Sequence, residues 1–179
     1  MLIHPIPAEV DDVPTTGSPK APRPRTESRA VTDPHLITVT AAQEGVTRSV
    51  STAELLDLPA QRLSAEYLCA KSGPQRHEFE GPSLYDVLCH VAPEAVPVSR
   101  RQRACALLGL WGEDGHRAVV AWAEFDPDFV AGTFLPATAV DGASLVERGP
   151  QLVSAGDGCG TRFVSGVTAL RVQVGVPAA

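Results

Sequence analysis

The chain has 179 residues, of which 44% are hydrophobic and 20% are charged, and its formal net charge is -6. This length suits one well-buried core and is short for two domains. The composition is typical of a globular protein and excludes a fibrous or wholly disordered chain. Because the charge is negative and the basic residues are scattered, we expect no nucleic-acid partner.

The N-terminal part of the sequence is unlike the rest. Seven of the sixteen prolines precede residue 35, and no aromatic residue occurs before Tyr67. A segment so poor in large apolar side chains cannot offset the conformational entropy lost on ordering. We therefore expect residues 1–33 to be a disordered, proline-rich tail and residues 34–176 to form a single domain.

The sequence also bears on location. The opening stretch MLIHPIPAEVDD has no basic region followed by an apolar one, and no later run has the roughly 20 apolar residues of a membrane-spanning helix. The cysteines Cys69, Cys89, Cys105 and Cys159 show no CxxC spacing. We expect a cytoplasmic protein with reduced thiols and no membrane partner.

The first half of the predicted domain begins with strands. LITVT and TRSVS flank Gly45 and predict a hairpin. Ser51 and Glu54 have capping-box spacing, which predicts one or two helical turns. RLSAEYLCA and RHEFE predict two strands joined by a polar turn, and Gly81-Pro82 is expected to end the second of them.

One clear helix is predicted next. Ser83 is a typical N-cap residue, and the apolar residues after it recur at the helical spacing i, i+3, i+4, i+7, which are Leu84, Val87, Leu88 and Val91. The sequence therefore predicts a short helix with one apolar stripe.

The second half of the sequence is dominated by strand-forming runs separated by turns rich in Gly and Asp. These runs are ACALLGLW, RAVVAW, TFLPATAV, PQLVS, TRFVS and VTALRVQV. Because strands and helices do not alternate, we predict an α+β, mainly β fold with mixed sheets and few short helices. Trp111 and Trp122 suit core packing or, alternatively, closure over a flat ring system.

The order of several segments resembles a known family. They are ITVT, STAELLDLP, YLCAKSG, FEGPSLYDVL, GEDGHRAVVAWAEFDP, VDGASL and GPQLVSAGDGCGTRFVSGVTALRV. Together they are similar to successive landmarks of the molybdopterin-binding domain of the sulfite oxidase family. The resemblance implies that family's fold, a molybdenum-molybdopterin cofactor, and an oxidoreductase that moves an oxygen atom or two electrons on a small-molecule substrate. It also implies a separate electron-transfer protein as partner.

Cys69 is the residue on which this functional interpretation depends most. The resemblance places it where the family supplies the cysteine thiolate that ligates molybdenum. A soft thiolate is a suitable ligand for a thiophilic metal, and Cys69 is therefore the candidate catalytic and metal-binding residue. The alternative is that it serves as a small buried hydrophobic residue.

The glycine-rich segment 156–160 is the second candidate. Its backbone amides would be available to an anionic ligand such as the phosphate of a pterin, or it is a simple hairpin connection. Asp157, Gly158 and Arg162 are the candidate cofactor-binding residues here. Asp157 could alternatively fix the loop or be an ordinary turn aspartate.

Two histidines complete the predicted site. His116 lies in a turn and is a candidate catalytic residue that donates to a substrate oxoanion or buffers a proton, or else it is an exposed turn histidine. His77 is a candidate cofactor-binding residue. Because side chains alternate along a strand, at most one of Arg76 and His77 should point inward.

A second hypothesis stays open beside the first. Gln151 and Ala155 replace the arginine and proline of the family's closing pattern. Since one fold hosts many functions, the chain could be a cofactor-free member of the same fold that acts as a small-molecule binding module or a cofactor-independent enzyme.

Overall fold

The structure is a computed structural model that describes residues 35–41, 44–130 and 134–175. The predicted tail over residues 1–33 lies outside the described residues. Within them, three β-sheets and a few short helices make the fold α+β and mainly β, as predicted. No helix in the described part of the chain is long and apolar enough to cross a membrane.

The largest sheet has five strands, in the order β2 (Val46–Ser51), β1 (Leu36–Ala41), β11 (Val167–Val174), β5 (Ala106–Gly112) and β6 (Arg117–Ala121). β1 and β11 are parallel, and all other neighbours are antiparallel. The hairpin predicted around Gly45 is confirmed: β1 pairs with β2, and Gly45 has a φ of 65°.

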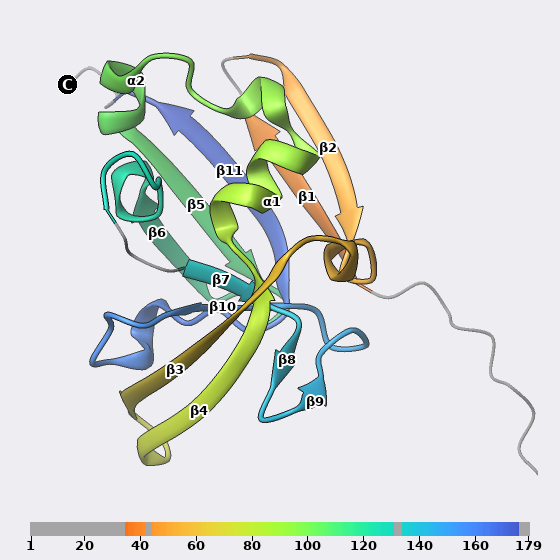
Figure 1. Cartoon of the computed structure of the whole chain (residues 1–179), viewed down its shortest axis with the longest axis vertical. Coiled ribbons are helices and arrows are strands. Elements are labelled where there is room, and N and C mark those ends of the chain that lie inside the picture. The colour runs from red at the N-terminus through yellow and green to blue at the C-terminus, as the bar shows by residue number, and fades with distance from the viewer. Residues whose placement is uncertain (1–34, 42–43, 131–133, 176–179) are drawn as a thin grey trace, which may run out of the picture. The chain divides into compact units, whose positions relative to one another are not determined.

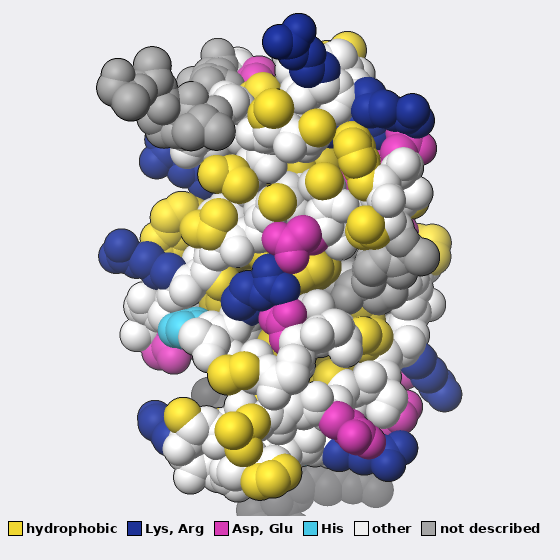
Figure 2. All heavy atoms as spheres, turned by 90° about the vertical axis from the view of Figure 1, so that its left-hand side faces the viewer, with side chains coloured by type: hydrophobic (Ala, Val, Ile, Leu, Met, Phe, Trp, Pro, Cys, Tyr) yellow, Lys and Arg dark blue, Asp and Glu magenta, His cyan; other side chains and the backbone are white. Residues whose placement is uncertain are grey.

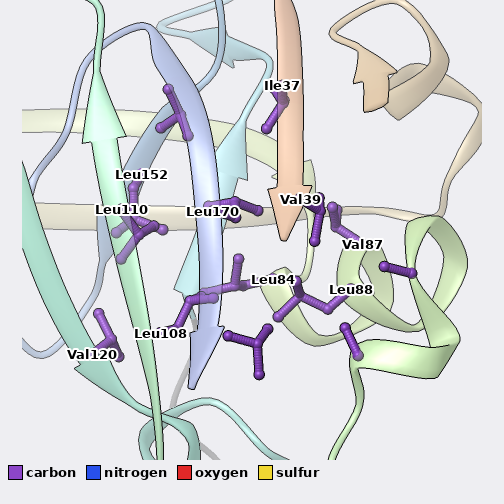
Figure 3. Close-up of a cluster of buried hydrophobic side chains, with 14 of the residues drawn as sticks. Ile37, Val39, Leu84, Val87, Leu88, Leu108, Leu110, Val120, Leu152 and Leu170 are labelled. Atoms are coloured by element: carbon purple, nitrogen blue, oxygen red, sulfur yellow. The ribbon is translucent and has the colours of Figure 1, made fainter. Parts of the chain in front are cut away.

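The predicted helix is confirmed as α1 (Leu84–Val91). Ser83 is its N-cap, because the Ser83 hydroxyl accepts a hydrogen bond from the backbone N–H of Asp86 at 3.0 Å. Of its predicted apolar stripe, Leu84, Val87 and Leu88 are fully buried in the main core, and Val91 is partly buried against it. Figure 3 shows the three fully buried side chains beside Ile37, Val39, Leu108, Leu110, Val120, Leu152 and Leu170. This packing forms the main core.

The other helices are single turns or little more. They are η1 (Glu54–Asp57), η2 (Pro93–Ala95), α2 (Arg100–Ala104), η3 (Trp122–Glu124) and η4 (Gly160–Arg162). Ser51 and Glu54 make the reciprocal hydrogen bonds of a capping box, since the Glu54 carboxylate accepts from the Ser51 N–H at 2.7 Å and the Ser51 hydroxyl accepts from the Glu54 N–H at 3.2 Å, although the N-cap position of η1 is Ala53. The helix α2 was not predicted.

A four-stranded sheet carries Cys69 and His77. Its order is β3 (Ala60–Cys69), β4 (Gly73–Pro82), β8 (Ala139–Val140) and β9 (Ala143–Ser144). Figure 1 shows the β3–β4 hairpin extending away from the five-stranded sheet. Strands β7 (Phe134–Ala137) and β10 (Gln151–Ser154) form a separate pair. A second, smaller core includes Phe79, Leu135 and Phe163.

The strand β4 ends at Gly81-Pro82 as predicted; these two residues are its last, and Pro82 pairs with Ala60 where the strand passes closely over β7. Two other local predictions are wrong. The run TFLPATAV is not one strand, because it is divided between β7 and β8, which belong to different sheets. The run TRFVS is not a strand: its first residues belong to η4, and only Val164 makes an isolated bridge, with Leu152.

Candidate functional site

Cys69 is the last residue of β3, and a three-residue turn connects it to Gly73, the first residue of β4. The thiol is half-buried and free. Hydrogen bonds from the Ser72 hydroxyl and then from the Ser72 and Lys71 backbone amides lower the pKa of Cys69 to about 7, and the nearby Lys71 charge adds to the effect. Near neutral pH a large share of Cys69 is therefore thiolate, the nucleophilic and metal-binding form.

The glycine-rich segment lies directly beside the end of β3. The backbone N–H of Leu68 donates to the Gly158 carbonyl at 3.0 Å, and Leu68 forms an isolated parallel bridge with Cys159. Gly160 fits under the Tyr67 ring, where an added Cβ would lie 2.8 Å from a ring carbon. The structure thus brings together Cys69 and the loop 156–160, as the site prediction requires.

Cys159 is a second thiol with altered acidity, and the sequence prediction gave it no role. Its Sγ lies 2.9 Å from Thr161 Oγ1, and hydrogen bonds from the Thr161 hydroxyl and amide lower its pKa. The negative charge of the Cys69 thiolate raises the pKa of Cys159, so the two thiols are close enough to interact electrostatically.

Arg162 and Asp157 hold the loop together. The Arg162 guanidinium donates to both Asp157 carboxylate oxygens, at 2.9 and 2.6 Å, and to the Glu124 carboxylate at 2.8 Å. It also stacks over the Phe134 ring. Two carboxylates therefore compensate the Arg162 charge and raise its pKa further. This arginine fixes the loop and has no charge left over for a phosphate.

His116 contacts the same loop from β5–β6. Its backbone N–H donates to Asp114 Oδ1, and its Nε2 lies 2.9 Å from the Thr161 carbonyl oxygen. Since a carbonyl only accepts, Nε2 is the protonated nitrogen of the ring in this contact. In this arrangement His116 positions Thr161, which in turn contacts the Cys159 thiol.

His77 lies elsewhere on the hairpin. Its Nδ1 lies 2.6 Å from Asp141 Oδ2 in the β8–β9 turn, and its ring packs edge-on against Phe79. The backbone N–H of Glu78 and then His77 lower the pKa of Asp141. The alternation prediction is confirmed, because Arg76 points to the other face and pairs with Glu66 at 3.4 Å. In the structure His77 joins the β8–β9 turn, and no hydrogen bond of the described residues links it to Cys69.

A hollow of about 400 Å³ lies next to this end of the hairpin. Its walls are Glu66, Tyr67, Leu68, Pro74, Gln75, Arg76 and Gly158. Tyr67 was missed by sequence reasoning, although its place two residues before Cys69 puts both side chains on the same face of the strand.

Figure 2 shows the face on the left of Figure 1, where acidic and basic side chains are interspersed and neither sign dominates.

The described residues contain no group of three or more His, Cys, Asp or Glu side chains placed to hold a metal ion.

Substituting Ser72 is expected to weaken the Cys69 thiolate. In Ser72→Ala the hydroxyl donor is lost, so the pKa of Cys69 should rise from about 7 toward the ordinary thiol value near 8.5. The rate of iodoacetamide alkylation at pH 7 should fall by up to about tenfold and converge with wild type at alkaline pH. Peptide mass spectrometry would follow Cys69, with the exposed Cys105 as internal control. An unchanged pH profile would show that Ser72 does not set this pKa.

Comparison with known proteins adds no relative: no protein-family model matches the sequence, and no curated protein is significantly similar to it.

Proposed function

We propose that the protein is a molybdopterin-dependent oxidoreductase in which Cys69 is the protein ligand of molybdenum. The observation that supports this most is the Cys69 thiol, whose pKa of about 7 and half-buried position make it a ready soft ligand. It stands where the sequence resemblance to the sulfite oxidase family expects such a ligand. A cytoplasmic location, where thiols stay reduced, belongs to this proposal.

Some of the residues around Cys69 suit a molybdopterin cofactor, and others do not. Tyr67 and Leu68 give the hollow an apolar wall, which suits a flat ring system. Arg162 is unsuited to anchor a phosphate because Asp157 and Glu124 occupy it. Arg76 lines the hollow and pairs with Glu66 over a long, exposed contact, but its side chain lies on the face of the hairpin opposite to that of Cys69.

When bound, the cofactor would supply transfer of an oxygen atom or of two electrons, and a separate electron-transfer protein would accept the electrons. The chain's own residues bind and orient. Cys69 would hold the metal, Ser72 favours the thiolate form of Cys69, and the loop at Gly158 would hold the anionic part. His116 and Arg162 keep the loop in place.

A second candidate function is a cofactor-free thiol site on the same fold that binds or modifies a small molecule. Two observations favour it: Cys159 is a second acidified thiol near Cys69, and Arg162 has no charge free for a cofactor phosphate. This candidate needs no metal, and metal content therefore separates it from the first.

The test is the metal content of protein purified from a host that makes the cofactor. We expect about one molybdenum atom per chain by elemental mass spectrometry, together with the fluorescence of the pterin that is released when the protein is denatured. Cys69→Ser should lose both, and the matched control Cys105→Ser should keep both. Folded wild-type protein without molybdenum would refute the first candidate and leave the cofactor-free thiol site.

A further inference from the structure

The free edge of β3 is the feature from which a further inference follows. β3 is the outermost strand of its sheet, with β4 on one side. The partners of Leu68 and Ala60 in β4 are both prolines, which have no N–H to donate, and the Leu68 N–H points instead to Gly158. The even-numbered residues of β3 therefore direct their backbone groups away from β4.

Part of this edge has no partner in the described structure. The loop at Gly158 covers it at Leu68, whereas the outward backbone groups of Arg62, Ser64 and Glu66 make no hydrogen bond with the described residues. An uncovered strand edge of this kind is a template for pairing with another strand. The side chains of these three residues are exposed, on the face opposite the small core.

The charges along this edge are self-complementary. In an antiparallel pair of two β3 strands centred on Ser64, Arg62 of each copy lies opposite Glu66 of the other. These are hydrogen-bonded pairs, in keeping with the outward direction of the even-numbered backbone groups. A register shifted by two residues, the smallest shift that keeps the outward backbone groups paired, places Arg62 opposite Ser64 and Glu66 opposite Ala60, and so loses both ion pairs. Charge thus selects one register.

The neighbouring strand extends the same pattern. Within one copy, Arg62 pairs with Glu80 at 3.2 Å and Glu66 pairs with Arg76 at 3.4 Å. In the dimer, four charged side chains would lie side by side across the joined sheet with alternating sign. They are Glu80 and Arg62 of one copy, followed by Glu66 and Arg76 of the second copy. On the other face, Leu63 would lie opposite Ala65 and continue the apolar surface of the small core.

From this edge we infer that the protein forms a two-fold symmetric dimer in which the β3 strands of two copies pair from Arg62 to Glu66 and join two four-stranded sheets into one. The inference does not depend on the proposed function. The paired segment is short, because Gly158 ends it at one side. The dimer is therefore a weak, concentration-dependent one rather than an obligate assembly.

The first test is sedimentation of the full-length protein at concentrations up to about 1 mM, where even weak association is detectable. Wild type should show a monomer–dimer equilibrium. Ser64→Pro removes only an outward-facing N–H, which an edge strand tolerates, and should give a monomer with an unchanged circular dichroism spectrum. A monomeric wild type, or a Ser64→Pro protein that dimerises as wild type does, would overturn the inference.

Charge reversal tests the register independently of folding. Arg62→Glu places glutamates opposite each other in its own dimer, and Glu66→Arg does the same with arginines, so each variant alone should be monomeric. In a one-to-one mixture both ion pairs are restored, one as in wild type and one with reversed polarity, and heterodimers should form. The intrachain neighbours Glu80 and Arg76 are the same in both experiments. A mixture that stays monomeric would overturn the proposed register.

Discussion

Replacing Trp122 with alanine is expected to lower the free energy of unfolding by about 3–5 kcal/mol. Trp122 is fully buried, its ring lies 5.0 Å from that of Phe125, and its Nε1–H donates to the buried carboxylate of Asp126 at 2.9 Å. The substitution removes the ring from the main core and takes one donor from Asp126. Urea unfolding followed by circular dichroism would measure the loss.

Two control variants separate the causes. Trp122→Phe keeps most of the packing and removes the donor to Asp126, so it should cost about 1–3 kcal/mol. Trp111→Ala changes a half-buried ring that packs on Gly109 and should cost less than Trp122→Ala. A Trp122→Ala protein within about 1 kcal/mol of wild type would show that this residue does not anchor the core.

Gly81→Ala is expected to destabilise the fold by about 3 kcal/mol. A Cβ at this position would lie 2.7 Å from the Pro136 carbonyl oxygen and 2.8 Å from the Cα of Ala137. Both are backbone atoms of β7, so no side chain can move aside, and β4 would have to separate from β7. Since β4 holds the hairpin that carries Cys69, the site should loosen as well.

Gly156→Ala is the matched control for Gly81→Ala, because an added Cβ at Gly156 meets nothing within 4 Å. Its unfolding free energy should stay within about 0.5 kcal/mol of wild type in the same urea titration. Equal losses in the two variants would contradict the close β4–β7 contact.

Much of the fold could be predicted from local sequence. The stripe of Leu84, Val87 and Leu88 behind the Ser83 cap gave α1, and the runs around Gly45 gave the β1–β2 hairpin, because each rests on residues close in sequence. The close contact of Gly81 with β7 could not be predicted in this way, because β7 lies more than fifty residues further along the chain.

The candidate site was predictable to a smaller extent. The place of Cys69 at a strand end follows from alternation and the turn after it, and the structure agrees. The ion pairs of Arg162 could not be predicted from local sequence, because one of its partners, Glu124, lies 38 residues away in sequence. Likewise, the link from His77 to Asp141 spans 64 residues and depends on how β8 pairs with β4.

The reactivity of the Cys69 thiol in protein purified from a host that makes molybdopterin is the most direct test of whether this residue ligates molybdenum. Protein from a cofactor-producing host would be treated with iodoacetamide at neutral pH, and each cysteine quantified by peptide mass spectrometry. Metal ligation predicts that Cys69 stays unmodified until the cofactor is released by denaturation, while the exposed Cys105 reacts from the start. Cys69 that reacts at the same rate before and after cofactor release would contradict it.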